Sequence, residues 1–266
     1  MREVSADRRI AAIIEYDGTG YSGWQSQAQA ASIQDAVQEA LSFVAGHPVV
    51  AICAGRTDRG VHAVGQVIHF DTQAARSPRA WVLGANSKLS AAIALQWAGE
   101  VDAGFHSRHR ATGRVYRYIV LNRSERSALQ NARVAWIHRP LDAARMHEAA
   151  QALIGEHDFS AFRSVECQSK TPVRRVDSIH VQRSGDHLYF DFVANAYLHH
   201  MVRNIVGTLI EVQNDADPKA RVAAILAGRD RRRAGYTAPP SGLYLWQVIY
   251  PPAFGIPSAP AGLLLK

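Results

Sequence analysis

The residues Gly55 to Gln66 read GRTDRGVHAVGQ and form the most informative stretch of the chain. One carboxylate, Asp58, stands between Arg56 and Arg59, and an apolar run at 49–54 precedes them. Flanking glycines after a strand predict a bent loop that presents the carboxylate to a polyanion. A carboxylate near guanidinium groups stays ionised and can serve as a nucleophile or a general base. An isolated motif of this kind is more often a surface ion pair, so the rest of the sequence has to distinguish a catalytic loop from a structural one.

The composition is that of a globular protein with a basic excess. The chain has 266 residues, of which 47% are hydrophobic and 20% charged, enough for one large domain or two modest ones. Lys and Arg number 30 against 23 Asp and Glu, and this net charge of +7 fits a nucleic-acid partner. Cys53 and Cys167 alone make neither a disulfide framework nor a metal site. Without a leader-like terminus or a run of membrane-spanning length, the chain is expected in the cytoplasm.

Hydrophobic periodicity predicts the same order of elements in both halves of the chain. In the first half we expect strands at 9–16, 49–54, 66–70 and 93–101, and helices at 32–44 and 77–89, the first capped by Ser32. In the second half we expect strands at 114–121, 173–182, 187–194 and 243–250, and helices at 142–154, 198–212 and 218–227. The tail from Pro251 is rich in Pro and Gly and is expected to pack loosely.

Each half therefore follows the order strand, helix, strand, strand, helix, strand, which is that of the ferredoxin-like fold. We predict an α+β protein in which two ferredoxin-like βαββαβ halves form a mixed, mainly antiparallel sheet with a central cleft. The first half, 1–108, carries the Asp58 loop. The second half, 109–266, carries Tyr116, Arg203 and Leu243.

Two aromatic motifs have both a structural and a functional interpretation. Tyr16 to Gln25, YDGTGYSGWQ, is a glycine-rich turn that lacks the spacing of a phosphate-binding loop. Its Tyr21 and Trp24 would either stack on bases or pack within the turn. Tyr116 and Tyr118 share one face of a predicted strand, as two core aromatics or with one ring on a nucleobase and Arg114 near the RNA backbone.

The predicted helix at 198–212 contains the pair His199-His200 and then Arg203. Adjacent helical side chains point apart, and no further ligand stands at metal-binding spacing, so a metal site is disfavoured. An arginine in an otherwise apolar helix needs an anionic partner, for which Asp58 is the candidate. The basic cluster 229–233 is either a solvated face or an RNA contact.

Taken together, these segments resemble the tRNA pseudouridine synthase A family. The resemblance spans nearly the whole chain and rests on the motifs YDGTGYSGWQ, GRTDRGVHAVGQVIHF, FHSR, RVYRY, HDFSAFR, HHMVRN and GLYL. Two departures are small. Tyr197 stands where the family usually has Phe, and Arg114 stands where Lys is also found. Neither departure is expected to touch the chemistry.

The resemblance implies the pseudouridine synthase fold and the isomerisation of uridine to pseudouridine at positions 38, 39 and 40 of the tRNA anticodon stem-loop. Asp58 matches the catalytic aspartate, and Tyr116 matches the tyrosine that stacks on the uracil. Arg203 matches the arginine that pairs with the aspartate, and Leu243 an apolar residue beside the base. Arg56 matches an arginine that holds the substrate, and Arg114 is expected to bind it as well. The family is homodimeric and uses neither a metal nor a cofactor.

Two other functions remain open at this point. A non-catalytic RNA-binding module would use the basic excess and the aromatic strands equally well, but it leaves an aspartate between arginines unexplained, because a carboxylate repels RNA. A metal-dependent hydrolase would be built on His62, His199 and His200.

Overall fold

The computed structural model of the chain describes residues 8–258, which form two compact units. The first unit comprises the chain up to Thr112 together with the residues from Leu245 on, and the second comprises Gly113–Tyr244. The division expected from the sequence differs from this one mainly in the last strand, which it assigns entirely to the second half.

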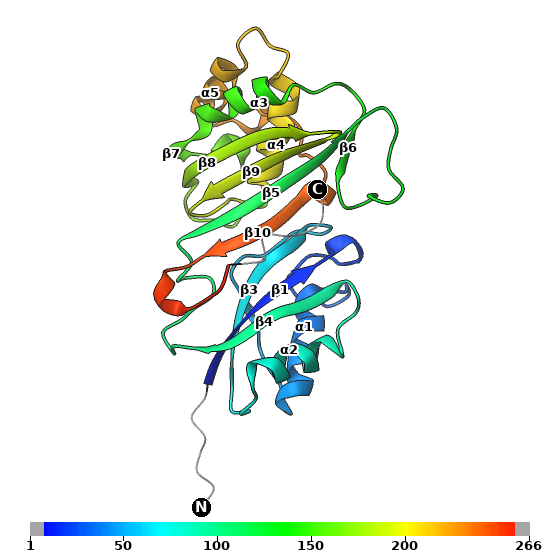
Figure 1. The fold of residues 1–266 in the computed structure, drawn as a ribbon. Coiled ribbons are helices and arrows are strands. Elements are labelled where there is room, and N and C mark those ends of the chain that lie inside the picture. The colour runs from blue at the N-terminus through cyan, green and yellow to red at the C-terminus, as the bar shows by residue number, and fades with distance from the viewer. Residues whose placement is uncertain (1–7, 259–266) are drawn as a thin grey trace, which may run out of the picture. The chain divides into compact units, whose positions relative to one another are not determined.

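The first unit follows the ferredoxin-like order (Figure 1). Its elements are β1 (Arg8–Tyr16), α1 (Ile33–Ala45), β2 (Ile52–Cys53), β3 (His62–Thr72), α2 (Pro78–Asn86) and β4 (Ile93–Val101). β1 pairs antiparallel with β3 and with β4, and β2 pairs with β3. The last strand, β10 (Leu243–Ile249), follows β3 in the sheet order. The predicted order of elements in this half is confirmed.

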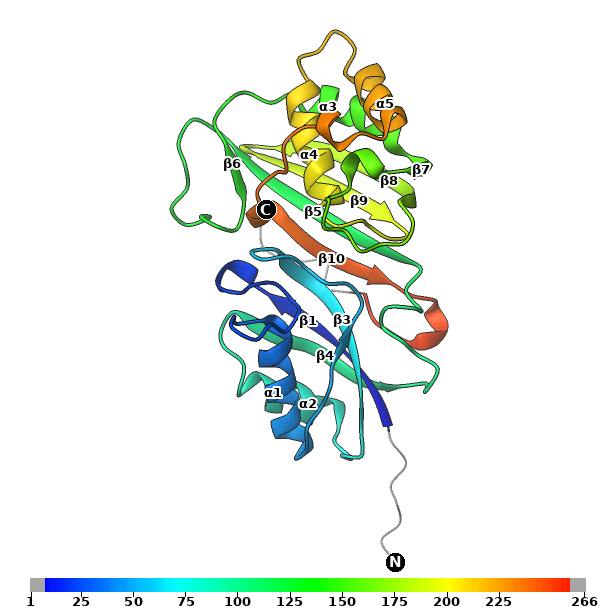
Figure 2. The same cartoon turned by 180° about the vertical axis from the view of Figure 1, so that it is seen from behind.

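Local sequence signals account for the two helices of this unit. The Ser32 side chain accepts the N–H of Asp35 at the start of α1, and Gly46 ends the helix at φ +76, in the left-handed region that favours glycine. Ser77 caps α2, and Pro78 occupies its first turn, where no intrahelical N–H partner is needed. α1 and α2 pack against each other (Figure 2).

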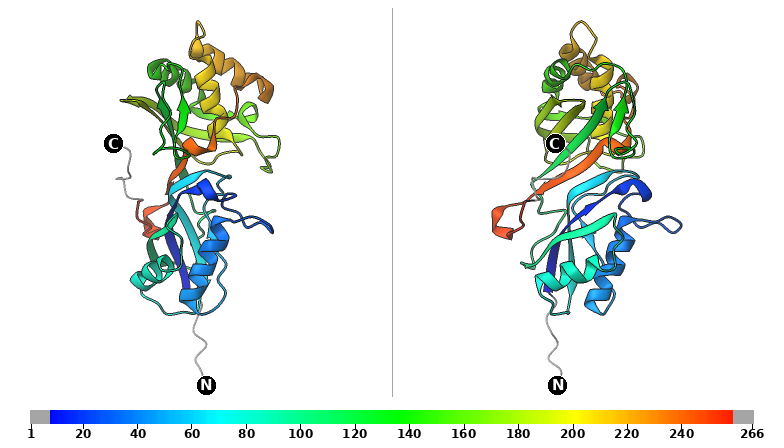
Figure 3. Two further views of the ribbon diagram at one scale, coloured as in Figure 1. Left: turned by 90° about the vertical axis from the view of Figure 1, so that its right-hand side faces the viewer. Right: turned by 45° about the vertical axis from the view of Figure 1, so that its right-hand side comes forward.

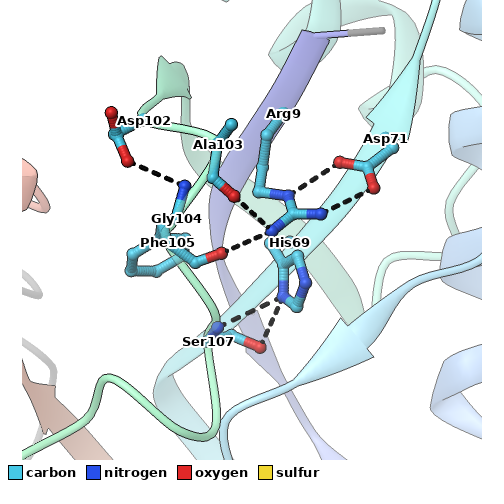
Figure 4. A network of polar contacts seen from close by, with 8 residues as sticks. All are labelled: Arg9, His69, Asp71, Asp102, Ala103, Gly104, Phe105 and Ser107. Atoms are coloured by element: carbon cyan, nitrogen blue, oxygen red, sulfur yellow. Dashed lines mark hydrogen bonds and ion pairs between the residues drawn. The ribbon is translucent and has the colours of Figure 1, made fainter.

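A polar network ties the turn after β4 to the sheet of the first unit (Figure 4). The Arg9 guanidinium makes two hydrogen bonds of 2.8 Å to the carboxylate of Asp71 and also donates to the carbonyls of Ala103 and Phe105, at 2.7 and 2.8 Å. β3 and the turn after β4 therefore meet at one side chain of β1, whose planar fork of donors suits such a junction.

The beginning of the carboxyl-terminal tail packs on the same turn. The Phe105 ring lies 5.2 Å from that of Tyr250 and 5.3 Å from that of Phe254, between ring centroids, and Phe105 is fully buried. Within the tail expected to pack loosely, Phe254 is therefore an exception, because it joins an aromatic cluster, whereas most of the other described tail residues are exposed. Residues 259–266 lie outside the described part of the chain.

The second unit carries the other elements of the fold (Figures 1 and 3). They are β5 (Gly113–Asn122), β6 (Ala135–Ile137), α3 (Ala143–Ala150), β7 (Gly155–Asp158), β8 (Val173–Ser184), β9 (His187–Ala194), α4 (Met201–Val212) and α5 (Pro218–Gly228). Its sheet has the order β5-β9-β8-β7, with antiparallel pairs, and β6 lies parallel to β5. The α+β class and the mainly antiparallel, mixed sheet are confirmed.

Three differences from the expected second half have physical reasons. β6 and β7 are only 3 and 4 residues long, too short for a periodic pattern to indicate them. α4 begins at Met201 rather than at residue 198, because His200 adopts φ +62 and interrupts helical geometry.

Within residues 8–258, no helix is both long enough and apolar enough to cross a membrane.

Candidate active site

The Asp58 loop lies between β2 and β3 in the first unit, as predicted. A turn closes it, in which Val61 donates its N–H to the Asp58 carbonyl oxygen at 3.1 Å, and Gly60 occupies the left-handed region at φ +75. Arg56 and Arg59 are exposed, whereas Asp58 is half-buried. The loop thus combines a partly shielded carboxylate with two accessible cations, a combination suited to a polyanionic substrate.

Trp24, a candidate for stacking on bases, belongs to the core of the first unit. Its side chain is 1% exposed, and its ring centroid lies 6.1 Å from that of Tyr16. The structure therefore favours the packed-turn interpretation of the motif for this residue. Tyr21, half-exposed, pairs its hydroxyl with the Ser90 hydroxyl at 2.9 Å.

The side chains of β5 alternate between the two faces of the sheet, as the sequence predicts. Tyr116 and Tyr118 stand opposite Phe192 and Phe190 of β9, and Arg117 between them stands opposite Asp191 on the other face. Arg117 and Asp191 form a two-pronged ion pair with contacts of 2.6 and 3.0 Å. Because neighbouring strand residues face opposite sides of a sheet, Arg117 points away from the tyrosines.

The two tyrosines have different surroundings. Tyr118 is fully buried and donates its hydroxyl to the Pro239 carbonyl at 2.8 Å, which makes it a core residue. Tyr116 is 8% exposed, and its ring meets that of Tyr197 edge-on, with centroids 4.8 Å apart. Tyr116 is therefore the tyrosine of the pair that retains some access to solvent.

Tyr197, one of the two departures from the family pattern, touches the candidate site. Besides its ring contact with Tyr116, it donates its hydroxyl to the Arg114 carbonyl at 3.2 Å. The Arg114 guanidinium in turn donates to the Asn195 carbonyl at 2.9 Å. Tyr197 thus contacts two of the candidate site residues, because β5 and the segment after β9 converge here; that the departure does not touch the chemistry stays a prediction. Arg114 supports the protein backbone in addition to any role toward RNA.

Arg203 lies in the first turn of α4, half-buried, and its Nε donates to the Ala238 carbonyl at 2.7 Å. The next residue, Asn204, is fully buried. Asn204 donates to the Phe162 carbonyl at 2.8 Å and accepts from the Thr237 hydroxyl at 2.7 Å. The first turn of α4 is therefore held by buried polar contacts, which are strong in a weakly polarisable interior.

The basic cluster 229–233 has a mixed role. Arg231 turns inward and donates to Asn204 and to the Gly235 carbonyl, at 3.0 and 2.8 Å. Arg232 is 90% exposed at its side chain and pairs with Asp230. Arg231 thus supports the surroundings of Arg203, whereas Arg232 lies on the solvated face expected for such a cluster.

The histidine pair is arranged differently from the expectation. His199 and His200 precede α4 rather than lying on it, and their ring centroids are 3.9 Å apart. The argument that adjacent helical side chains diverge does not apply, because α4 begins at Met201 and His200 adopts a left-handed conformation. His62 belongs to the other unit, is 2% exposed, and accepts the N–H of Gly18 at 3.1 Å.

Leu243 is the first residue of β10 and is 6% exposed. The preceding Gly242 allows a close approach, since a Cβ atom there would lie 2.7 Å from the Tyr118 ring. Tyr116, Arg114, Arg203 and Leu243 all belong to the second unit, whereas Asp58 and Arg56 belong to the first. Contact between Asp58 and Arg203 would join the two units and stays a prediction.

Comparison with known proteins matches both units to one family. A family model described as tRNA pseudouridine synthase matches residues 12–109 and 149–251. A relative from Idiomarina loihiensis, named tRNA pseudouridine synthase A, is 52% identical over 256 residues, which cover 96% of this chain and 98% of the relative.

The chain belongs to the tRNA pseudouridine synthase family.

Two further relatives carry the name tRNA pseudouridine synthase A. The protein of Aeromonas hydrophila subsp. hydrophila is 52% identical, over 96% of this chain and 95% of its own length. That of Shewanella baltica is 51% identical, over 96% of this chain and 98% of its own length. Membership of the tRNA pseudouridine synthase family thus rests on nearly complete coverage in both directions.

Several residues that shape the site were missed in the sequence analysis. They are Thr57, Gln66, Asn204 and Thr237, all of them polar and buried or half-buried. A signal was present for two of them, because Gln66 lies in an apolar strand and Asn204 in an apolar helix. Buried polar groups need partners, so such positions indicate a structured polar network.

Proposed function

We propose that this tRNA pseudouridine synthase isomerises uridine to pseudouridine at positions 38, 39 and 40 of the tRNA anticodon stem-loop, with Asp58 as the catalytic carboxylate. The observation that carries the proposal is the Asp58 loop, which a left-handed Gly60 turn closes between two exposed arginines. Membership of the family supports the reaction and tRNA as the substrate.

The reaction needs no redox step. The N1–C1′ bond of uridine breaks, the detached uracil turns while it is held, C5 joins C1′, the hydrogen on C5 leaves as a proton, and N1 takes up a proton. Cleavage of the glycosidic bond develops positive charge on the sugar, which a carboxylate stabilises. Three routes fit an aspartate: attack on C1′, removal of a sugar proton to give a glycal, and addition to C6 of the ring. No cofactor is required by any of them.

The remaining site residues have proposed roles that follow from their chemistry. Tyr116 stacks on the target uracil and takes part in proton removal, and Leu243 supplies an apolar wall that excludes water from the reactive sugar. Arg203 pairs with the Asp58 carboxylate and offsets its negative charge. Arg56 holds the flipped-out nucleotide, whose extraction from the stem costs a few kcal/mol. Arg114 contributes to RNA binding.

We further propose that the protein is a cytoplasmic homodimer that binds the tRNA backbone through arginines, largely by shape. The basic net charge of +7 supports RNA binding, and the family resemblance supports the dimer. Light scattering after size exclusion tests the dimer: a mass of one chain at micromolar concentration would contradict it.

The deciding experiment is the release of tritium from tRNA transcripts labelled at C5 of uridine, measured with and without chelator. Wild type is expected to release tritium, and Asp58→Asn is expected to release none while it still binds tRNA. Asp186→Asn, which changes an exposed carboxylate in a hairpin turn, serves as the matched control and is expected to keep wild-type activity. Transcripts with cytidine at positions 38, 39 and 40 test the target.

The outcomes separate the candidate functions. Tritium release by Asp58→Asn at the wild-type rate would contradict the catalytic role of Asp58. Tight tRNA binding by wild type without release would favour a non-catalytic RNA-binding module. Loss of release on adding chelator would favour a metal-dependent reaction.

A further inference from the structure

The glycine-rich segment Tyr16–Gln25 packs directly on the Asp58 loop. The Tyr16 hydroxyl lies 2.8 Å from the Thr57 hydroxyl, and the backbone N–H of Trp24 donates to the Thr57 carbonyl at 3.0 Å. Thr57, the residue before Asp58, is 6% exposed. The segment therefore holds both the side chain and the backbone of the residue that immediately precedes the carboxylate.

Two glycines make this contact possible on both sides of Asp58. A Cβ atom on Gly23 would lie 2.6 Å from the Thr57 carbonyl oxygen and 3.0 Å from the Asp58 carbonyl carbon, and Gly23 also has φ +93. A Cβ atom on Gly18 would lie 2.1 Å from the Val61 carbonyl oxygen. Neither distance is compatible with a side chain, so backbone meets backbone at both positions.

A chain of buried polar groups connects the same contact to β3. Gln66 is fully buried, and its Nε2 donates to the Gly55 carbonyl at 2.6 Å and to the Tyr16 hydroxyl at 3.4 Å. Gln66 thus reaches the start of the loop, while Tyr16 links it to Thr57. Buried hydrogen bonds polarise one another, so the chain resists displacement of any one member.

The segment is itself fixed to α1. Ile33 and Gln34, at the start of this helix, donate their N–H groups to the carbonyls of Gly23 and Trp24, at 3.1 and 3.0 Å. These donors lie in the first turn, where a helix has no internal acceptors for them. The segment thus connects α1 to the Asp58 loop through backbone hydrogen bonds.

We propose that Tyr16–Gln25 is the positioning element of the active site, and that Tyr16 and Thr57 are positioning residues that set the direction of the Asp58 carboxylate. The proposal rests on the proposed role of Asp58. On this proposal the segment affects the rate of the chemical step and does not serve to stack on RNA bases. A carboxylate held in its reactive direction avoids the rate loss that a misplaced group suffers.

The test compares single hydroxyl deletions in single- and multiple-turnover tritium release. Tyr16→Phe is expected to lower kcat about 10-fold or more while KM changes less than about twofold, because the carboxylate is misdirected but the RNA surface is intact. Thr57→Val is expected to match it, and Thr57→Ser, which keeps the hydroxyl, is expected to restore activity. The double variant of Tyr16→Phe with Thr57→Val should lose no more than Tyr16→Phe alone, since Tyr16→Phe already removes the contact with Thr57 as well as the one with Gln66.

Tyr21→Phe is the matched control, because Tyr21 belongs to the same segment but pairs with Ser90. It is expected to keep the wild-type kcat. Gly18→Ala and Gly20→Ala form a second, independent comparison. A Cβ atom on Gly18 would lie 2.1 Å from the Val61 carbonyl oxygen, whereas a Cβ atom on Gly20 meets nothing within 4 Å. Thermal melting of every variant separates loss of folded protein from loss of rate.

Each result has one meaning. An unchanged kcat in Tyr16→Phe, or an equal loss in Tyr21→Phe, would overturn the positioning role while wild-type activity stands. A rise in KM with constant kcat would assign the segment to RNA binding instead. Absence of release by wild type would contradict the proposed function itself, a separate outcome.

Discussion

Arg203 and Ala238 hold each other through two hydrogen bonds: Arg203 Nε donates to the Ala238 carbonyl at 2.7 Å, and the Ala238 N–H donates to the Arg203 carbonyl at 3.1 Å. The segment that ends at Ala238 runs close along α4, since a Cβ atom on Gly207 would lie 1.9 Å from the Tyr236 carbonyl oxygen. The direction of the Arg203 side chain is therefore set by the segment between α5 and β10, and not by α4 alone.

The first prediction concerns Asn204, which joins that segment to α4. Its side chain contacts Phe162, Thr237 and Arg231, and all of these partners would lose a hydrogen bond in Asn204→Ala. Unpaired buried polar groups cost 1–3 kcal/mol each, so the free energy of unfolding in urea is expected to fall by about 3 kcal/mol. The exposed Asn131→Ala is the control, expected to change it by less than about 0.5 kcal/mol. Equal effects of the two substitutions would refute the buried network.

Tyr197→Phe restores the residue usual in the family and removes one hydroxyl. Loss of its hydrogen bond to the Arg114 carbonyl is expected to lower the free energy of unfolding by about 1 kcal/mol. Tritium release should stay near that of wild type, because the ring contact with Tyr116 remains. Tyr197→Ala removes the ring too, and is expected to lower kcat by about 10-fold through a displaced Tyr116. Full activity of Tyr197→Ala would show that the ring contact is dispensable.

The stability of the first unit is expected to depend on pH through His69. His69 is 2% exposed, and its Nδ1 atom lies 2.9 Å from the Ser107 hydroxyl oxygen, within hydrogen-bonding distance. Burial, together with the nearby His106 and Arg9, lowers the pKa of this imidazole to about 4. The unfolded imidazole takes up a proton below pH ~6.5, whereas the folded one stays neutral until pH ~4. The stability that His69 confers is therefore complete above pH ~6.5 and is lost on acidification between these values, by about 3 kcal/mol at most.

Urea unfolding of wild type and His69→Gln between pH 7.5 and 4 measures this effect. The variant keeps a polar group for Ser107 but has no titrating ring, so its stability should fall less steeply over this range. Groups remote from His69 titrate alike in both proteins, so the difference between the two curves reports His69 together with its coupled neighbours His106 and Asp71. Parallel curves would show that the His69 pKa is not lowered by folding.

The two cysteines are expected to differ in reactivity. Burial raises the pKa of the Cys53 thiol to about 11. Partial burial also disfavours the Cys167 thiolate, but the N–H groups of His199 and Ser169 and the Arg163 guanidinium outweigh it and bring the Cys167 pKa below its usual value. Iodoacetamide at pH 7.5 should therefore modify Cys167 at least about 100-fold faster, as measured by peptide mass spectrometry. In urea the two rates should converge, and similar rates in the folded protein would count against both pKa shifts.

The sequence by itself determined the elements whose signals are local. Ser32 caps its helix as predicted, and Ser77 and Asp142, with which two other predicted helices begin, act as caps too, because a cap is a contact within one turn of the chain. The order of elements followed from hydrophobic periodicity for the same reason. The Asp58 loop was also evident from the sequence, since its glycines and charges stand next to one another.

Only the tertiary structure decided the features that depend on residues far apart in the chain. It buried Trp24, brought Tyr197 onto Tyr116, turned Arg231 inward and joined β10 to the first unit. The short β6 is a strand only because β5 supplies its partner. Each of these outcomes depends on which distant groups can satisfy a buried polar atom or fill a space, and no pattern of neighbouring residues contains that information.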